Sequence, residues 1–114
     1  MNNKQRLPFE RENLNKVERD SRKVNCVKFN TNNSLAHELT KAKVAFFLQK
    51  CGKKFLTECK FCDGSGEADV YCISDDVCYE ITHSETREHA LAKKYPVSEI
   101  RVIKSNKLRR CDLE

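Results

Sequence analysis

Apolar residues recur at helical spacing in one long segment of the chain. A polar cluster at 31–34 ends in Ser34, and it is followed by apolar side chains at Leu35, Leu39, Ala42, Ala45 and Phe46. Serine is a favourable N-cap residue, and positions three and four residues apart share one face of a helix. Gly52 is a typical C-terminal stop. The pattern therefore predicts a helix over 35–50.

Four shorter apolar segments have the residue types of β-strands. They lie at 53–59, 68–73, 77–82 and 100–103, with turn residues at 63–66 and 74–76. A second helix is predicted over 85–94, capped by Ser84 and ended by Pro96. The predicted order is helix, three strands, helix, strand. We expect an α/β domain with a central mixed four-stranded sheet flanked by helices.

The strands at 68–73 and 77–82 are predicted to form a hairpin, whose register decides which side chains meet. A turn of even length places Asp69 opposite Thr82, with Glu80 as its diagonal neighbour on the same face. An odd turn would point the two carboxylates to opposite faces. With the even turn, the other face carries the apolar core residues Val70, Cys72, Tyr79 and Ile81.

The charge of the chain is concentrated at its two ends. The 114 residues carry a net charge of +5; residues 1–30 hold 8 basic and 4 acidic residues, residues 31–103 hold 10 and 11, and residues 104–114 hold 4 and 2. We expect a basic arm over 1–30, either helical over 10–22 or disordered, a domain over 31–104 and a basic tail over 105–114.

Two basic ends suit a polyanionic partner, because phosphate contacts supply most sequence-independent affinity for nucleic acid. Solvated tails are the alternative interpretation. The residues expected to contact DNA are Arg6, Arg11, Arg19, Arg22, Lys23, Lys107, Arg109 and Arg110. No apolar run approaches the roughly 20 residues of a membrane span, and the first residues lack the apolar stretch of a signal peptide. We therefore expect a cytoplasmic protein without a membrane partner.

Seven cysteines without a secretion signal indicate reduced thiols, most of them buried. Cys59 and Cys62 have the spacing of a zinc-ligand pair, but no second pair follows. A zinc-stabilised interaction protein, with Cys51 and another cysteine completing the site, is therefore a minor alternative.

Asp69 and Glu80 are the candidate metal ligands. Two carboxylates that face one point repel each other unless a cation joins them, and oxygen ligands select hard ions such as Mg²⁺ or Mn²⁺. Such an ion can activate water and stabilise charge on a phosphoryl group. The alternative is that both side chains are merely exposed on an open face of the sheet.

The order of elements, together with Glu38 in the first helix, Gly66-Glu67-Ala68-Asp69 entering the second strand and Tyr79-Glu80-Ile81-Thr82 on the third, resembles the PD-(D/E)XK nuclease superfamily. The resemblance covers residues 34–104 and is nearest to small archaeal, viral or competence-type nucleases. It implies a restriction-endonuclease-like αβββαβ core. It also implies that Asp69 and Glu80 bind Mg²⁺ or Mn²⁺, with Glu38 as the acid contributed by the helix.

Two positions depart from the family pattern. Ala68 replaces a proline that mainly shapes the strand entry, and Thr82 replaces a lysine that assists the attacking water. A threonine hydroxyl is a poor proton acceptor at neutral pH. Lys41 lies on the same helical face as Glu38 and is the candidate substitute. His37 and His83 are further candidates for direct participation, with a surface hydrogen-bonding role as the alternative. Glu58 and Glu67 are candidates for the outer shell of the metal ion or are solvated. Glu85 is expected to favour the start of the second helix, with a role at the site as the alternative.

The sequence therefore predicts a Mg²⁺-dependent DNA endonuclease. Cutting both strands needs two sites, so we expect a twofold homodimer, from an archaeal or viral source and acting in the host cell if virus-encoded. The main alternative is a catalytically silent DNA- or junction-binding module, in which Thr82 marks a lost lysine.

Overall fold

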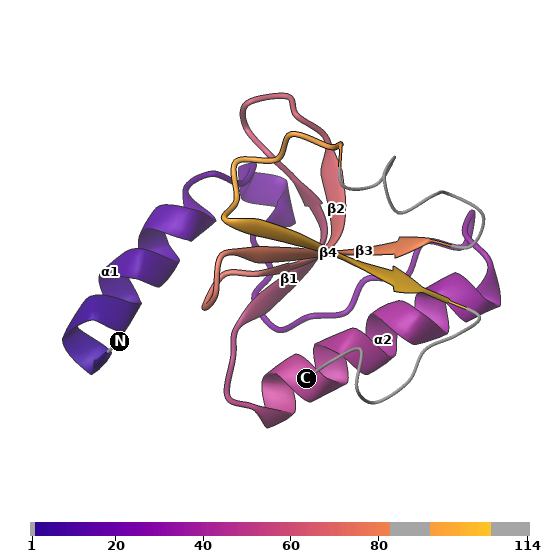
Figure 1. Cartoon of the computed structure of the whole chain (residues 1–114), viewed down its shortest axis with the longest axis horizontal. Helices are drawn as coiled ribbons and strands as arrows, with labels where there is room; N and C mark the ends of the chain where they lie inside the picture. Colours follow the sequence, from indigo (N-terminus) through magenta and orange to yellow (C-terminus); the bar gives the residue numbers. More distant parts are fainter. Residues whose placement is uncertain (1, 83–91, 106–114) are drawn as a thin grey trace.

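A computed structural model describes residues 2–82 and 92–105 of the chain. It contains helices α1 (Asn3–Leu14) and α2 (Leu35–Lys50), the 3-10 helix η1 (Arg19–Ser21) and strands β1 (Phe55–Lys60), β2 (Glu67–Cys72), β3 (Val77–Thr82) and β4 (Glu99–Lys104). The four strands form one sheet (Figure 1), and their order in it is β1-β2-β3-β4. The first three are antiparallel neighbours, and β4 runs parallel to β3. This confirms the α/β class with a mixed four-stranded sheet.

Helix α2 has the bounds that the sequence predicts. The hydroxyl of Ser34 accepts a hydrogen bond from the N–H of His37 at 3.1 Å, which satisfies one of the free donors of the first turn. The chain leaves the helix through Gly52 with a φ of +75°, a conformation that suits glycine. Local residues therefore set both ends of α2.

The sheet carries a hydrophobic core on each face. Along the first face lies α2 (Figure 1), and its core contains Val44, Ala45, Leu48, Phe55, Val70, Cys72, Val77, Tyr79, Ile81 and Ile103. This set confirms the prediction that Val70, Cys72, Tyr79 and Ile81 face the core together. The other core contains Val17, Leu56, Cys59, Phe61, Ala68, Tyr71, Ile73, Cys78 and Tyr95.

The β2–β3 hairpin has an even turn, but its register differs by two residues from the prediction. The paired residues are Val70 with Tyr79, Tyr71 with Cys78 and Cys72 with Val77. Continued by one residue past the last pair, this register brings Asp69 opposite Glu80. The expected partner of Asp69 was Thr82. A shift of two residues keeps each side chain on its face, because the side-chain period of a strand is two. The two carboxylates are thus direct rather than diagonal neighbours.

The N-terminal segment packs against the sheet. Its helix covers Asn3–Leu14 rather than 10–22, because Asn2 and Gln5 form a capping box that starts the helix at Asn3. The side chain of Asn13 donates to the carbonyl of Ile73 at 2.8 Å. Val17 is fully buried and forms an isolated bridge with Phe61.

Residues after α1 cover the free edge of β1. The N–H of Glu18 donates to the Lys60 carbonyl at 2.9 Å, and the N–H of Asn25 donates to the Phe55 carbonyl at 2.8 Å. The N–H of Lys28 donates to the Thr57 hydroxyl at 2.9 Å. These contacts satisfy backbone and side-chain groups that an exposed edge strand would leave open.

The predicted helix at 85–94 falls mostly outside the described residues. Only residues 92–94 of that range are described, and they form a turn and irregular backbone that leads to Tyr95. Within the described part of the chain, neither helix has the length and apolar character of a membrane span.

Candidate functional site

The candidate site lies where β2 and β3 separate. The carboxylate of Glu80 accepts a hydrogen bond from the N–H of Asp69 at 3.2 Å, and the carboxylate of Asp69 accepts one from the N–H of Ile81 at 2.8 Å. Side-chain oxygens here satisfy backbone N–H groups beyond the last pair of the ladder. Two acidic side chains from adjacent strands are thereby held next to each other.

Both carboxylates have little contact with solvent. The side chain of Glu80 is 2% exposed and that of Asp69 is 21% exposed. Burial, together with the negative charge of Glu80, raises the pKa of Asp69 to about 7, although the Ile81 N–H and His37 act in the opposite direction. The pair therefore favours a proton or a cation beside Asp69 at neutral pH.

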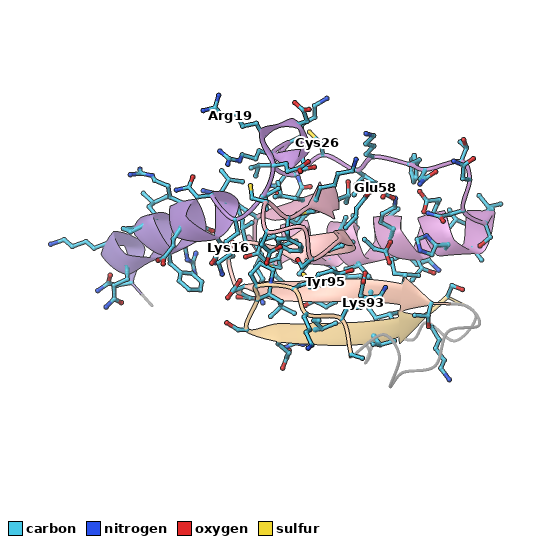
Figure 2. All side chains as sticks on the ribbon, turned by 90° about the horizontal axis from the view of Figure 1, so that it is seen from above. Lys16, Arg19, Cys26, Glu58, Lys93 and Tyr95 are labelled. Atoms are coloured by element: carbon cyan, nitrogen blue, oxygen red, sulfur yellow. The ribbon has the colours of Figure 1, made fainter. Side chains whose placement is uncertain are left out.

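Lys93 and Tyr95, which precede β4 in the chain, both contact Glu80. Lys93 Nζ lies 3.0 Å from Glu80 Oε1, and the hydroxyl of Tyr95 lies 2.6 Å from the same oxygen. The Tyr95 ring packs on Phe61 with a centroid distance of 5.2 Å, which fixes this segment against the second core. Figure 2 labels Lys93 and Tyr95 beside each other. The sequence analysis named neither residue, because nothing in their local pattern shows that they reach β3.

Glu38 and His37 connect α2 to Asp69. His37 Nδ1 lies 2.6 Å from Glu38 Oε2, and His37 Nε2 lies 3.5 Å from Asp69 Oδ1. Glu38 also accepts from the N–H of Asn30 and from Asn33 Nδ2. Burial raises the pKa of Glu38, but the hydrogen bonds from Asn30, Lys41 and His37 outweigh it and lower the pKa to about 2. Glu38 thus remains ionised and reaches Asp69 through His37.

Lys41, the substitute lysine suggested by the sequence, is fully buried. Its Nζ lies 2.7 Å from Glu38 Oε1 and 2.5 Å from Glu58 Oε1, and it donates to the carbonyl of Lys28 at 2.7 Å. It lies on the same helical face as Glu38, as expected. The ammonium group of Lys41 thus connects α2 to β1 and to the loop that precedes α2. This is a structural role.

Thr82 is buried, and its hydroxyl has no hydrogen-bond partner among the described residues. On β3 it has the same parity as Glu80 and therefore faces the same side of the sheet. His83 lies outside the described residues, as does Glu85.

Glu58 and Glu67 form a second acidic contact next to the site. A hydrogen bond to Glu58, together with burial and the charge of Glu58, raises the pKa of Glu67. Both side chains line a surface hollow of about 260 Å³ whose wall includes Lys23, Lys28 and Lys60. Glu58 has a φ of +49°, which is uncommon for a residue with a side chain.

The expected DNA contacts are only partly described. Arg6, Arg11, Arg19 and Lys23 are exposed. The Nε of Arg22 donates to the carbonyl of Val17 at 2.8 Å, so this side chain also has a structural contact. Lys107, Arg109 and Arg110 lie outside the described residues.

The cysteine pair of the zinc alternative is divided between core and surface. Cys59 is buried, whereas Cys62 and Cys51 are exposed. Burial, with smaller contributions from Glu67 and Cys62, raises the pKa of Cys59 to about 12. Cys59 therefore lies in the core, away from the surface positions of Cys62 and Cys51.

Asp69 and Glu80 fit a magnesium ion better than a zinc ion. Across residues 2–82 and 92–105, no three His, Cys, Asp or Glu side chains form a metal-binding group. Structural zinc needs four protein ligands. Mg²⁺ usually keeps several waters and binds one or two carboxylates together with substrate phosphates. Two adjacent carboxylates, one of them Asp69 with its raised pKa, meet that requirement.

Comparison of the chain with protein-family models, with curated proteins and with solved structures found no match to any of them.

Proposed function

We propose that the protein is a Mg²⁺-dependent nuclease that hydrolyses phosphodiester bonds of DNA, with Asp69 and Glu80 as the metal ligands. The observation that carries the proposal is the placement of the buried Glu80 carboxylate beside the half-buried Asp69 carboxylate, where β2 and β3 separate. The sheet order and the parallel β3–β4 pair agree with the restriction-endonuclease-like core that the sequence resemblance implies.

The chain's own groups have separate tasks in this proposal. Asp69 and Glu80 hold Mg²⁺ or Mn²⁺, which supplies Lewis-acid polarisation of the phosphoryl group when bound. His37, held by Glu38, orients the Asp69 carboxylate. Glu38 acts through His37, since four hydrogen-bonding groups already surround its oxygens. Lys41 fixes the position of Glu38.

Binding of the substrate is assigned to basic side chains. Arg19 and Lys23 are exposed and are proposed to contact the phosphate backbone, with Lys107, Arg109 and Arg110 from the C-terminal tail. Because cutting of both strands needs two sites, we also propose a twofold homodimer. Sedimentation of the purified protein, alone and with DNA, tests the dimer.

A silent DNA-binding module is the second candidate. It is favoured by the contacts of Glu80, whose oxygens already meet the Asp69 N–H, Lys93 and Tyr95. Glu80 thus has a counter-charge without a metal ion. This candidate predicts DNA binding that does not depend on Mg²⁺ and no cleavage.

The experiment that separates the two candidates is cleavage of supercoiled plasmid, branched DNA and single-stranded DNA with Mg²⁺ or Mn²⁺. Wild type is compared with Asp69→Asn and Glu80→Gln, which keep side-chain size but remove charge. Cleavage that needs the metal and disappears in both variants supports the nuclease. DNA binding without cleavage by the wild type supports the silent module, and cleavage of RNA alone would overturn the choice of substrate.

A further inference from the structure

We propose that Lys93, from the segment before β4, is the catalytic cation of the site. This inference rests on the proposed function. In the proposed reaction the oxygen of a water forms a bond to phosphorus, and the bond from phosphorus to the leaving ester oxygen breaks with its electron pair on that oxygen. The water releases one proton to solvent, and the leaving oxygen takes one from solvent. Lys93 keeps its protons and stabilises the charge on the non-bridging phosphoryl oxygens.

The position of Lys93 is the first argument. Its Nζ lies 3.0 Å from Glu80 Oε1, so its charge lies directly beside one of the two proposed metal ligands. The Lys93 side chain is 35% exposed whereas that of Glu80 is 2% exposed, so Lys93 is the more accessible member of this ion pair. A substrate phosphate that approaches Glu80 from solvent would meet this charge.

The anchoring of the segment is the second argument. Two residues after Lys93, the Tyr95 ring packs on Phe61, and its hydroxyl contacts both Glu80 Oε1 and the carbonyl of Glu67, at 2.6 and 2.9 Å. Tyr95 thus joins the segment to β2 and β3 at once. A preorganised donor of this kind needs no reorganisation when charge develops in the transition state.

The third argument is that Thr82 and Lys41, the other two candidates for this role, do not supply an accessible positive charge. Thr82 occupies β3 two residues after Glu80, and its hydroxyl carries no charge. Lys41 is fully buried and is held by Glu38, Glu58 and the Lys28 carbonyl. Of these three side chains, Lys93 alone combines a positive charge, contact with Glu80 and access to solvent.

The test compares Lys93→Met, which keeps the length of the side chain but removes its charge, with Lys93→Arg. Lys94→Ala changes the adjacent exposed lysine and is the matched control. With supercoiled plasmid and Mg²⁺, we expect kcat of Lys93→Met to fall by about 100-fold or more with little change in KM, as for loss of one preorganised donor. Lys93→Arg keeps part of the activity, and Lys94→Ala cleaves like wild type.

Calorimetric titration with Mn²⁺ distinguishes this role from a structural one. The Lys93 ammonium and Mn²⁺ both interact with Glu80. Lys93→Met should therefore bind Mn²⁺ as tightly as wild type or more tightly, although this variant no longer cleaves DNA. A second variant, Thr82→Lys in the Lys93→Met background, places a lysine on β3 itself and should restore part of the cleavage.

Different experimental outcomes would contradict the role of Lys93 and the proposed nuclease function. A wild type that cleaves no substrate overturns the nuclease itself. A wild type that cleaves, with Lys93→Met within about twofold of Lys94→Ala, overturns only the role of Lys93. Loss of cleavage together with loss of Mn²⁺ binding also overturns it, since Lys93 would then act by holding Glu80 in place.

Discussion

Glu38 and Lys41 lie one turn apart on α2 and form an ion pair of 2.7 Å inside the protein. Lys41 is fully buried, and its ammonium also pairs with Glu58 on β1 at 2.5 Å. A buried charge that loses its partner has a large desolvation cost. The ion pair therefore makes the folded state depend on both partners.

Lys41→Met should destabilise the protein by about 3–5 kcal/mol, because it leaves the buried Glu38 and the half-buried Glu58 without their shared cation. Urea unfolding followed by circular dichroism measures this loss. Lys43→Met, at an exposed position of the same helix, is the control and should change the stability by less than about 0.5 kcal/mol. Equal stability of the two variants would contradict the structural role of Lys41.

Asp69 makes the stability of the protein dependent on pH. Its pKa is about 7 in the folded protein, through burial and the charge of Glu80, and about 3.9 in an unfolded chain. Between these values the folded state keeps a proton that the unfolded state releases, so the free energy of unfolding falls as pH rises. Glu38, with its lowered pKa, acts in the opposite direction but mainly below pH 5. Thermal unfolding at pH 5 to 7 should show the decrease, and Asp69→Asn should reduce the slope.

Mg²⁺ should stabilise the folded protein at pH 8, which is above the pKa of about 7 of Asp69. A ligand that binds only the folded state raises the unfolding free energy by an amount set by its concentration relative to Kd. Thermal unfolding with increasing MgCl₂ measures the effect. The melting temperature of Glu80→Gln should respond less, and an equal response would place the ion elsewhere.

Gly66 leaves room for Tyr95. Its φ is +136°, and a Cβ atom at this position would lie 3.1 Å from Tyr95 Cε1. Gly66→Ala should therefore cost about 1–3 kcal/mol from backbone strain and displace the tyrosine ring from Glu80. Chemical denaturation measures the loss. Gly64→Ala is the control, because Gly64 also has a positive φ but a Cβ atom added there would meet no atom within 4 Å. An equal loss of stability in the two variants would exclude a specific effect on Tyr95.

Local residues explain which parts of the fold could be predicted from the sequence. Ser34 and Gly52 end α2 by local capping, so the helix is predicted at its observed bounds. The strand β3 is predicted just as well, because its six residues are strand formers between turn signals. The start of α1 was missed because the capping box of Asn2 and Gln5 precedes a segment with few apolar residues.

Tertiary contacts explain what the sequence could not predict. The even turn places Asp69 and Glu80 on one face, but the position of the turn, with Asp76 at a φ of +59°, sets the register that makes them direct neighbours. Lys41 has the right helical spacing to Glu38, yet its contact with Glu58 depends on how β1 packs against α2. The contact of Lys93 with Glu80 depends on the packing of Tyr95, which spacing alone does not reveal.

The burial of Val17 and Asn13 limits how far the chain can be shortened from its N-terminal end. Removal of residues up to Ser21 would uncover part of the second core and free the backbone of Lys60, which Glu18 now satisfies. The first turns of α1 are exposed instead, with Leu7 at 57% exposure. An affinity tag or fluorescent label attached before Asn2 therefore leaves the folded unit intact, whereas a deletion that passes Glu10 would yield an aggregation-prone fragment.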